Sequence, residues 1–263
     1  MATGITAPDR ANIDARSLRR DNWWAAPLTT FTILLAFVFY GSWRAFEGTN
    51  YYAAPYLSPF YSPCLSVNCV EGSADLGTPV GGWFPLSPAL IILPVLLLFR
   101  LTCYYYRKAY YRAFWLSPPA CAVSEPHGSY SGERRFPLIL QNSHRIWLYF
   151  AILQLFILSW DVVLAFRSPG GEWGHMGLGT LVLLVNAALL WLYTLSCHSC
   201  RHVIGGRLNH YGKHPVRYRL WTYVSAINGR HMQFAWVSLF SVALTDLYIR
   251  AVAAGALSDP RFF

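Results

Sequence analysis

Five long apolar runs constrain the fold of this chain more than any other feature of its sequence. They cover residues 28–46, 86–103, 146–166, 178–197 and 232–257. An α-helix needs about 20 mostly apolar residues to cross the ~30 Å hydrocarbon layer of a membrane. Because lipid offers the backbone no hydrogen-bond partner, runs of this length must form helices. We therefore predict an all-α membrane protein built as a bundle of five transmembrane helices.

The overall composition supports a membrane location. Hydrophobic residues make up 55% of the 263 residues and charged residues only 13%, whereas an ordinary soluble domain has about 25% charged residues. The net charge of +9 could suggest a nucleic-acid partner, but a chain this apolar needs a bilayer as its solvent. We expect membrane lipid, and no nucleic acid, as a partner.

The positions of lysine and arginine predict the orientation of the bundle. Of the 21 basic residues, 17 lie in residues 1–27, 100–145 and 201–230. The positive-inside rule places such segments in the cytoplasm. We therefore predict a multi-pass protein of the inner (cytoplasmic) membrane. Its N-terminal segment 1–27 and its loops 104–143 and 201–230 are expected inside, and its loop 47–85 and its C-terminal tail 258–263 outside.

The start of the chain does not look like a signal peptide, since residues 1–27 are polar and lack an apolar core. The outer loop contains Cys64 and Cys69. An extracytoplasmic compartment permits disulfides, so these two cysteines are predicted to form a short-range bridge, with a pair of free thiols as the alternative.

Cysteine and histidine gather at the predicted inner membrane boundary. Cys197 and Cys200 lie three residues apart, so on a helix they would share one face and could bind one ion. His144 opens the third span and His231 the fifth, at the same depth. Two thiolates and two imidazoles suit zinc or a two-iron cluster. The first choice of ligands is Cys197, Cys200, His144 and His231; the other candidates at this boundary are Cys103, Cys121, His198 and His202.

Two acidic residues fall inside predicted spans. Asp161 lies late in the third span and Asp246 in the second half of the fifth, with Arg44 and Arg250 at similar depth. Ionisable groups inside the hydrocarbon layer are costly and are candidates for function. The carboxyl groups could supply protons to a reduced quinone and the arginines could line its pocket. Alternatively, these residues could form ion pairs between helices.

Several motifs together resemble the membrane anchor of the mycobacterial and actinobacterial, type-F, succinate dehydrogenases (complex II). They are Cys103-Tyr-Tyr-Tyr-Arg-Lys-Ala-Tyr-Tyr-Arg, Pro118-Pro119-Ala120-Cys121, Cys197-His-Ser-Cys-Arg-His, His231-Met-Gln-Phe-Ala-Trp and Thr245-Asp246-Leu247-Tyr248. The resemblance covers most of the chain from the second span onward. It implies a complex with a flavoprotein that oxidises succinate and an iron–sulfur protein that docks on the cytoplasmic face.

The same resemblance implies that electrons enter the membrane and reduce a quinone, so the chain would be a subunit of a succinate:quinone oxidoreductase. Better-known five-helix anchors hold two haem b groups on four histidines. Here the first two spans contain no histidine, which argues against haem. The resemblance instead suggests a Rieske-type [2Fe–2S] cluster held by two cysteines and two histidines, which matches the first-choice ligands above.

Two other functions are compatible with parts of the sequence. The first is a membrane thiol–disulfide oxidoreductase that uses Cys197 and Cys200, with Cys64 and Cys69 as its partner pair. The predicted topology puts these pairs on opposite sides of the membrane, which argues against exchange between them. The second is a small-solute transporter, for which internal repeats are typical. The similar helix starts at Asn142 and Asn228 are only a weak repeat.

Overall fold

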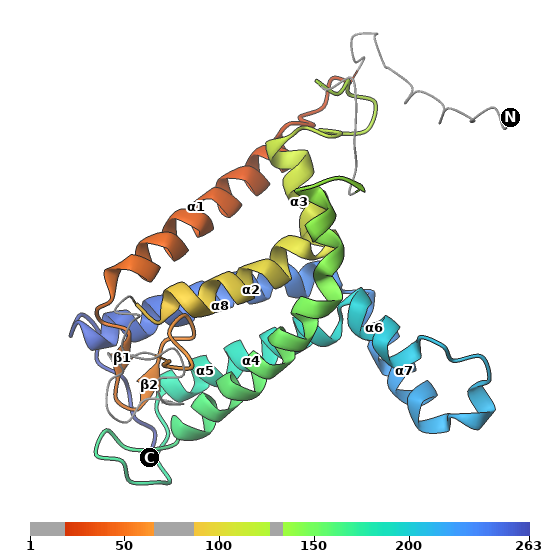
Figure 1. Ribbon diagram of the computed structural model, residues 1–263. Helices are drawn as coiled ribbons and strands as arrows, with labels where there is room; N and C mark the ends of the chain where they lie inside the picture. Colours follow the sequence, from red (N-terminus) through yellow and green to blue (C-terminus); the bar gives the residue numbers. More distant parts are fainter. Residues whose placement is uncertain (1–18, 66–86, 127–133) are drawn as a thin grey trace, which may run out of the picture.

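The computed structural model describes residues 19–65, 87–126 and 134–263, and these residues are mostly helical (Figure 1). Two short strands, β1 (Tyr52–Ala53) and β2 (Tyr56–Leu57), form one antiparallel ladder. The α-helices are α1 (Ala25–Glu47), α2 (Ala89–Thr102), α3 (Tyr104–Phe114), α4 (His144–Leu164), α5 (Leu178–Leu195), α6 (His198–Gly205), α7 (Pro215–Asn228) and α8 (His231–Ala253). The 3₁₀ helices are η2 (Leu138–Ser143) and η3 (Tyr211–Lys213).

The apolar runs form the long helices of this bundle. In the described residues, α1, α4 together with η2, α5 and α8 are each long and apolar enough to cross a membrane. The second run forms α2, which has 14 residues and meets the same criterion only together with α3, across a bend of 83°. The described residues are therefore mostly helical, with four candidate membrane spans and a fifth that depends on this bent pair, and the count of five stays a prediction.

The chain breaks its helices at two cysteines. Cys103 separates α2 from α3 with an extended backbone at φ −63° and ψ 128°. Cys197 precedes α6 with almost the same angles, φ −63° and ψ 141°. Helical residues have ψ near −42°, so each cysteine ends the preceding helical path and redirects the chain. As a result, the segments 104–143 and 201–230, which the sequence predicts as loops, contain the helices α3, η2 and α7 and most of α6.

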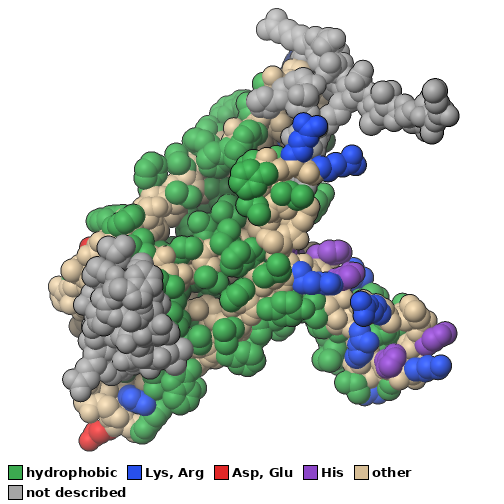
Figure 2. Space-filling model, viewed as in Figure 1, with side chains coloured by type: hydrophobic (Ala, Val, Ile, Leu, Met, Phe, Trp, Pro, Cys, Tyr) green, Lys and Arg blue, Asp and Glu red, His purple; other side chains and the backbone are tan. Residues whose placement is uncertain are grey.

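We call the end of the bundle that carries α3, α6 and α7 the basic end. Helices α6 and α7 project from the long helices as an arm (Figure 1). Figure 2 shows that lysine, arginine and histidine side chains gather on this arm, while hydrophobic side chains cover the long helices. The basic residues that the sequence concentrates in a few segments thus also gather at one end of the folded chain. This distribution agrees with the predicted cytoplasmic orientation of the basic end, which stays a prediction.

The opposite end of the bundle is tied together by the C-terminal tail. The backbone of Phe262 donates to the Met176 carbonyl at 2.8 Å, and Leu178 donates to the Pro260 carbonyl at 2.9 Å. The Asp259 carboxylate accepts the Tyr56 hydroxyl at 2.7 Å and the Gly179 amide at 2.8 Å. The tail 258–263 therefore packs on the start of α5. Cys64, at this end, is disulfide-bonded, and Cys69 lies outside the described residues.

The close approach of Tyr56 to α5 gives a test of the fold. A Cβ atom at Gly179 would lie 2.5 Å from the Tyr56 ring. Gly179→Ala should therefore separate β2 from α5 and lower the free energy of unfolding by about 1–3 kcal/mol. Gly41→Ala in α1, where nothing lies within 4 Å of the new Cβ, is the matched control and should be neutral or slightly stabilising. Thermal unfolding of the purified complex in detergent measures both, and equal midpoints would contradict the packing described.

Candidate functional site

Two cysteines and two histidines meet in pairs at the basic end. His144, the first residue of α4, places its Nε2 atom 3.0 Å from the Cys197 sulfur. His231, the first residue of α8, places its Nε2 atom 3.4 Å from the Cys103 sulfur. Both sulfur-bearing side chains are almost fully buried, with exposed fractions of 2% for Cys103 and 1% for Cys197. Each pair joins two helix termini that lie far apart in the sequence.

The two pairs are built from matching halves of the chain. Phe99-x-x-Thr102-Cys103 closes α2, and Tyr193-x-x-Ser196-Cys197 follows the same spacing at the end of α5. Shorter helices then follow, α3 in the first half and α6 and α7 in the second, and a histidine opens the next long helix in each half. Cys103 of the first half contacts the histidine of the second half, and Cys197 contacts the histidine of the first. Each cysteine is therefore paired with the histidine that belongs to the other half of the chain.

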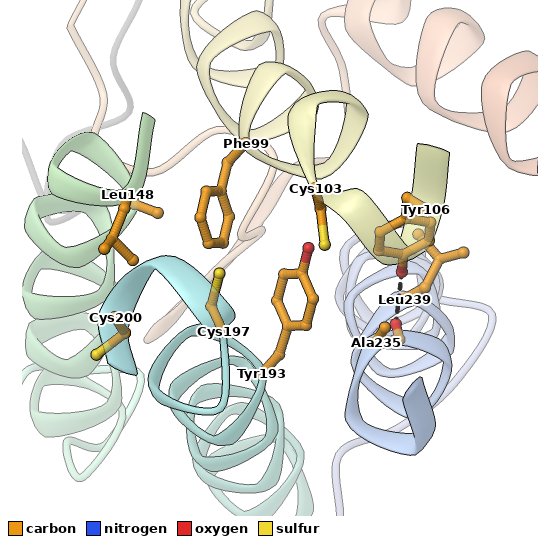
Figure 3. Packing of buried hydrophobic residues seen from close by; sticks show 10 residues of the cluster. Phe99, Cys103, Tyr106, Leu148, Tyr193, Cys197, Cys200, Ala235 and Leu239 are labelled. Atoms are coloured by element: carbon orange, nitrogen blue, oxygen red, sulfur yellow. Dashed lines mark hydrogen bonds between the residues drawn. The ribbon is translucent and has the colours of Figure 1, made fainter. Parts of the chain in front are cut away.

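Aromatic rings hold the histidines in place. The His144 ring stacks on Phe99 with centroids 4.8 Å apart, and the His231 ring stacks on Tyr193 at 5.2 Å. Phe99 and Tyr193 meet edge to face at 5.5 Å, so they connect the two pairs. The Tyr193 hydroxyl is buried and points toward the Cys103 sulfur (Figure 3). It makes no hydrogen bond to a nitrogen or oxygen atom of the described residues.

Three of the four first-choice ligands, Cys197, His144 and His231, take part in these two pairs, and the remaining member is Cys103 instead of Cys200. Figure 3 shows the Cys197 sulfur pointing toward Phe99, whereas the Cys200 sulfur points away from it. The prediction that Cys197 and Cys200 share a helix face assumed a continuous helix, but the extended backbone at Cys197 interrupts it.

The remaining candidates lie apart from these pairs. Cys121 is exposed and free, and His198 and His202 are exposed on α6. The His202 ring lies beside the Arg145 guanidinium. Within residues 19–65, 87–126 and 134–263, no group of three or more histidine, cysteine or acidic side chains surrounds a single metal position. The observed arrangement is two cysteine–histidine pairs.

An apolar cavity of about 280 Å³ lies in the bundle beside the rings that stack on the two histidines. Helices α1, α2, α4 and α5 supply most of its wall. Phe99 and Tyr193, the rings that stack on the two histidines, line it at the basic end. Arg100 and Gln154 add polar groups to a wall that is otherwise largely hydrophobic. The cavity therefore touches the same rings that hold the histidines.

The charged residues predicted inside the spans form a buried network at the opposite end. Asp246, fully buried, accepts the Tyr40 hydroxyl at 2.6 Å and the Arg250 Nε–H at 2.9 Å, and also the Ser58 hydroxyl. Glu47 accepts from Arg250 at 2.9 Å and from Arg44 at 2.5 Å. These contacts join α8 to α1. They correspond to the alternative named in the sequence analysis, in which Asp246, Arg44 and Arg250 form ion pairs between helices.

Asp161 has a different environment. It is 3% exposed and accepts the Ser62 hydroxyl through Oδ2, while its Oδ1 atom has no hydrogen-bond partner among the described residues. Gln154 donates to the backbone carbonyl of Ser62 and lines the cavity. Ser62 thus connects the Asp161 carboxyl group to the cavity wall.

Comparison with known proteins identifies the family. The family model described as "Actinobacterial succinate dehydrogenase subunit SdhC" matches residues 25–255. The chain belongs to this family. A chain of the solved structure "Mycobacterium smegmatis Sdh1 complex in the apo form" is 57% identical to this one, with a TM-score of 0.88 and full coverage of both chains. A search of the curated proteins finds no match.

Membership of the SdhC family confirms the resemblance found in the sequence. The chain is a membrane subunit of succinate dehydrogenase, an oxidoreductase. The matched region begins with α1 and ends just after α8. It therefore includes all four residues of the cysteine–histidine pairs and the cavity beside them.

The buried network of this SdhC chain gives a second test. Asp246→Asn would leave the Arg250 guanidinium, which is 4% exposed, without one of its two counter-charges, since Asp246 and Glu47 each lie 2.9 Å from it. Removing one partner of a buried ion pair is strongly destabilising, here by about 3 kcal/mol. Thermal unfolding of the purified complex measures the loss. Glu172→Gln, an exposed acidic residue, is the control. A midpoint for Asp246→Asn equal to that of the control would contradict the structural role of the network.

Proposed function

We propose that this subunit passes electrons from a docked iron–sulfur protein to a quinone through a Rieske-type [2Fe–2S] cluster held at the basic end. The ligands proposed are Cys103, Cys197, His144 and His231. The observation that carries the proposal is the convergence of two buried thiols and two imidazoles from separate helix termini. This convergence lies beside an apolar cavity inside the bundle.

The donors fit such a cluster in number and type. In a Rieske centre two cysteines hold one iron and two histidines hold the other. Each half of the chain supplies one thiol and one imidazole, so the two halves together supply the two cysteines and two histidines of such a centre. The cluster, when bound, would transfer single electrons at a potential raised by its histidine ligands.

The chain's own residues position these donors and keep water away. Phe99 and Tyr193 fix the planes of the two imidazole rings. Leu148, Ala151 and Leu239 pack around them in the same buried cluster. Low local polarity favours retention of a metal centre and tunes its potential.

The cavity suits a quinone headgroup with its apolar tail. A quinone offers a flat, largely apolar ring and carbonyl oxygens that accept hydrogen bonds, and the cavity offers apolar walls with Arg100 and Gln154. Because Phe99 and Tyr193 line the cavity and contact the histidines, a quinone there would lie close to the proposed cluster. Of the two acidic candidates, Asp161 is the better proton donor, since it connects through Ser62 to Gln154.

The partners follow from the family and from the charge of the basic end. The related structure is described as an Sdh1 complex, which supports assembly of this chain with a flavoprotein and an iron–sulfur subunit. The arginine-rich helices α3, α6 and α7 offer a positive surface for docking of the iron–sulfur subunit. This arrangement agrees with a cytoplasmic orientation of the basic end in the inner membrane.

Thiol exchange between Cys197 and Cys200 has less support. Their sulfurs point in different directions (Figure 3), and the disulfide-bonded Cys64 lies at the opposite end of the bundle. A zinc ion would also accept two thiolates and two imidazoles. Metal analysis separates zinc from the cluster.

The ligand set is tested by two matched serine substitutions. The purified complex should contain an iron–sulfur cluster with a Rieske-type electron paramagnetic resonance signal when reduced. Cys103→Ser should abolish this signal and quinone reduction, because it removes a proposed ligand, whereas Cys200→Ser should retain both. Zinc without this cluster in the membrane subunit, or loss of the signal only in Cys200→Ser, would refute the assignment.

The quinone position is tested by filling the cavity. Gly41 lines the cavity, and nothing lies within 4 Å of the position that a Cβ atom would take there, so Gly41→Leu should occupy the space that the quinone needs. We expect quinone reduction to fall at least tenfold while succinate oxidation with a soluble dye is unchanged. Gly212→Leu, at an equally open position outside the cavity, should leave both activities intact. Full quinone reduction in Gly41→Leu would place the quinone elsewhere.

A further inference from the structure

His144 and His231 can act as ligands through Nε2 only if that nitrogen carries no proton. A neutral imidazole carries one proton, on either Nδ1 or Nε2. Only a ring with its proton on Nδ1 presents a bare Nε2 atom to the neighbouring sulfur or to a metal. The residues around Nδ1 therefore decide whether His144 and His231 can act as ligands.

A hydroxyl group faces Nδ1 in both halves of the site. The Thr102 Oγ1 atom lies 2.8 Å from Nδ1 of His144, and the Ser196 Oγ atom lies 2.8 Å from Nδ1 of His231. Both side chains are buried, with exposed fractions of 5% and 0%. Each hydroxyl directly precedes the cysteine of its own half.

Each hydroxyl has a helix carbonyl within reach as an acceptor. The Thr102 Oγ1 atom lies 2.7 Å from the Leu98 carbonyl, and the Ser196 Oγ atom lies 3.0 Å from the Tyr193 carbonyl. A hydroxyl has one proton to donate and two lone pairs to accept. When that proton is donated to the helix carbonyl, the oxygen can only accept from the ring, which places the imidazole proton on Nδ1.

We propose that Thr102 and Ser196 are positioning residues that fix both histidines in the Nδ1–H tautomer and direct both Nε2 lone pairs toward the cysteine sulfurs. The assignment of a cluster to these lone pairs rests on the proposed function, whereas the tautomer is inferred from the hydrogen-bond geometry around each ring. Both halves contain this arrangement, because the aromatic residue, the hydroxyl residue and the cysteine have the same spacing in each half.

Removal of a hydroxyl should release this constraint. Thr102→Val and Ser196→Ala keep the approximate shape of the side chain but remove the hydroxyl acceptor that faces Nδ1, which weakens the preference for the Nδ1–H tautomer. Loss of such an outer hydrogen bond typically costs 10–100-fold in metal affinity. The lost acceptor also makes the imidazole a weaker electron donor, which should raise the midpoint potential of a bound cluster.

The tautomer can be measured without a metal. In the whole complex, labelled with ¹⁵N-histidine, depleted of metal by a chelator and placed in lipid nanodiscs, solid-state NMR distinguishes protonated from bare ring nitrogens. We expect two Nδ1–H imidazoles that are lost one at a time in Thr102→Val and Ser196→Ala and kept in Thr102→Ser and Ser196→Thr. Ser159→Ala, whose hydroxyl also donates to a helix carbonyl but accepts from Trp191, is the control. Nδ1–H signals that are absent, or unaffected by both variants, would overturn the proposal.

The loaded complex gives an independent measurement. Resistance of the cluster to chelator should fall at least tenfold in Thr102→Val and Ser196→Ala, and the midpoint potential should rise. Thr102→Ser should restore both values. An unloaded wild-type complex would refute the proposed cluster without affecting the NMR result. A loaded complex whose variants keep the wild-type retention and potential would refute the positioning role.

Discussion

The extended backbone at Cys103 and Cys197 is the constraint on which the rest of the structure depends. In lipid, a helix satisfies its own backbone hydrogen bonds, so a break is best placed where a span meets the interface. At both breaks the sulfur turns into the bundle, the preceding hydroxyl faces a histidine, and the following helix leaves the bundle axis. One local conformation, used twice, therefore forms the site and the surface around it.

Polar chemistry is divided between the two ends of the helices. At the opposite end, Asp246, Glu47, Arg44 and Arg250 form ion pairs that join α1 to α8. At the basic end, the polar side chains of the site are thiols, hydroxyls and imidazoles. Neutral groups cost less to bury than ions, and cysteine binds a metal centre after losing its proton. The apolar cavity extends between these two ends.

The sequence predicted much of this arrangement because length and hydropathy determine what can span a membrane. The five apolar runs correspond to α1, α2, α4, α5 and α8, and three of the four proposed donors lie at predicted positions. Cys103 was only a rival candidate because helical spacing favoured Cys200, and that spacing fails where the backbone is extended. The shared spacing of Phe99, Thr102 and Cys103 with Tyr193, Ser196 and Cys197 was the signal that could have identified the pair. The ion pairs of Asp246 remained undecided because partner choice depends on tertiary packing.

The position of the cavity favours electron transfer over a purely structural metal. A structural zinc site needs four donors and a closed surround, and nothing in that role requires an apolar chamber beside its ligands. Here Phe99 and Tyr193 belong to both the cysteine–histidine pairs and the cavity, since each ring stacks on a histidine and also helps line the cavity. A substrate in the cavity would therefore lie one aromatic ring away from each imidazole. In a subunit of succinate dehydrogenase, this proximity is what transfer of electrons from a protein-bound centre to a membrane quinone requires.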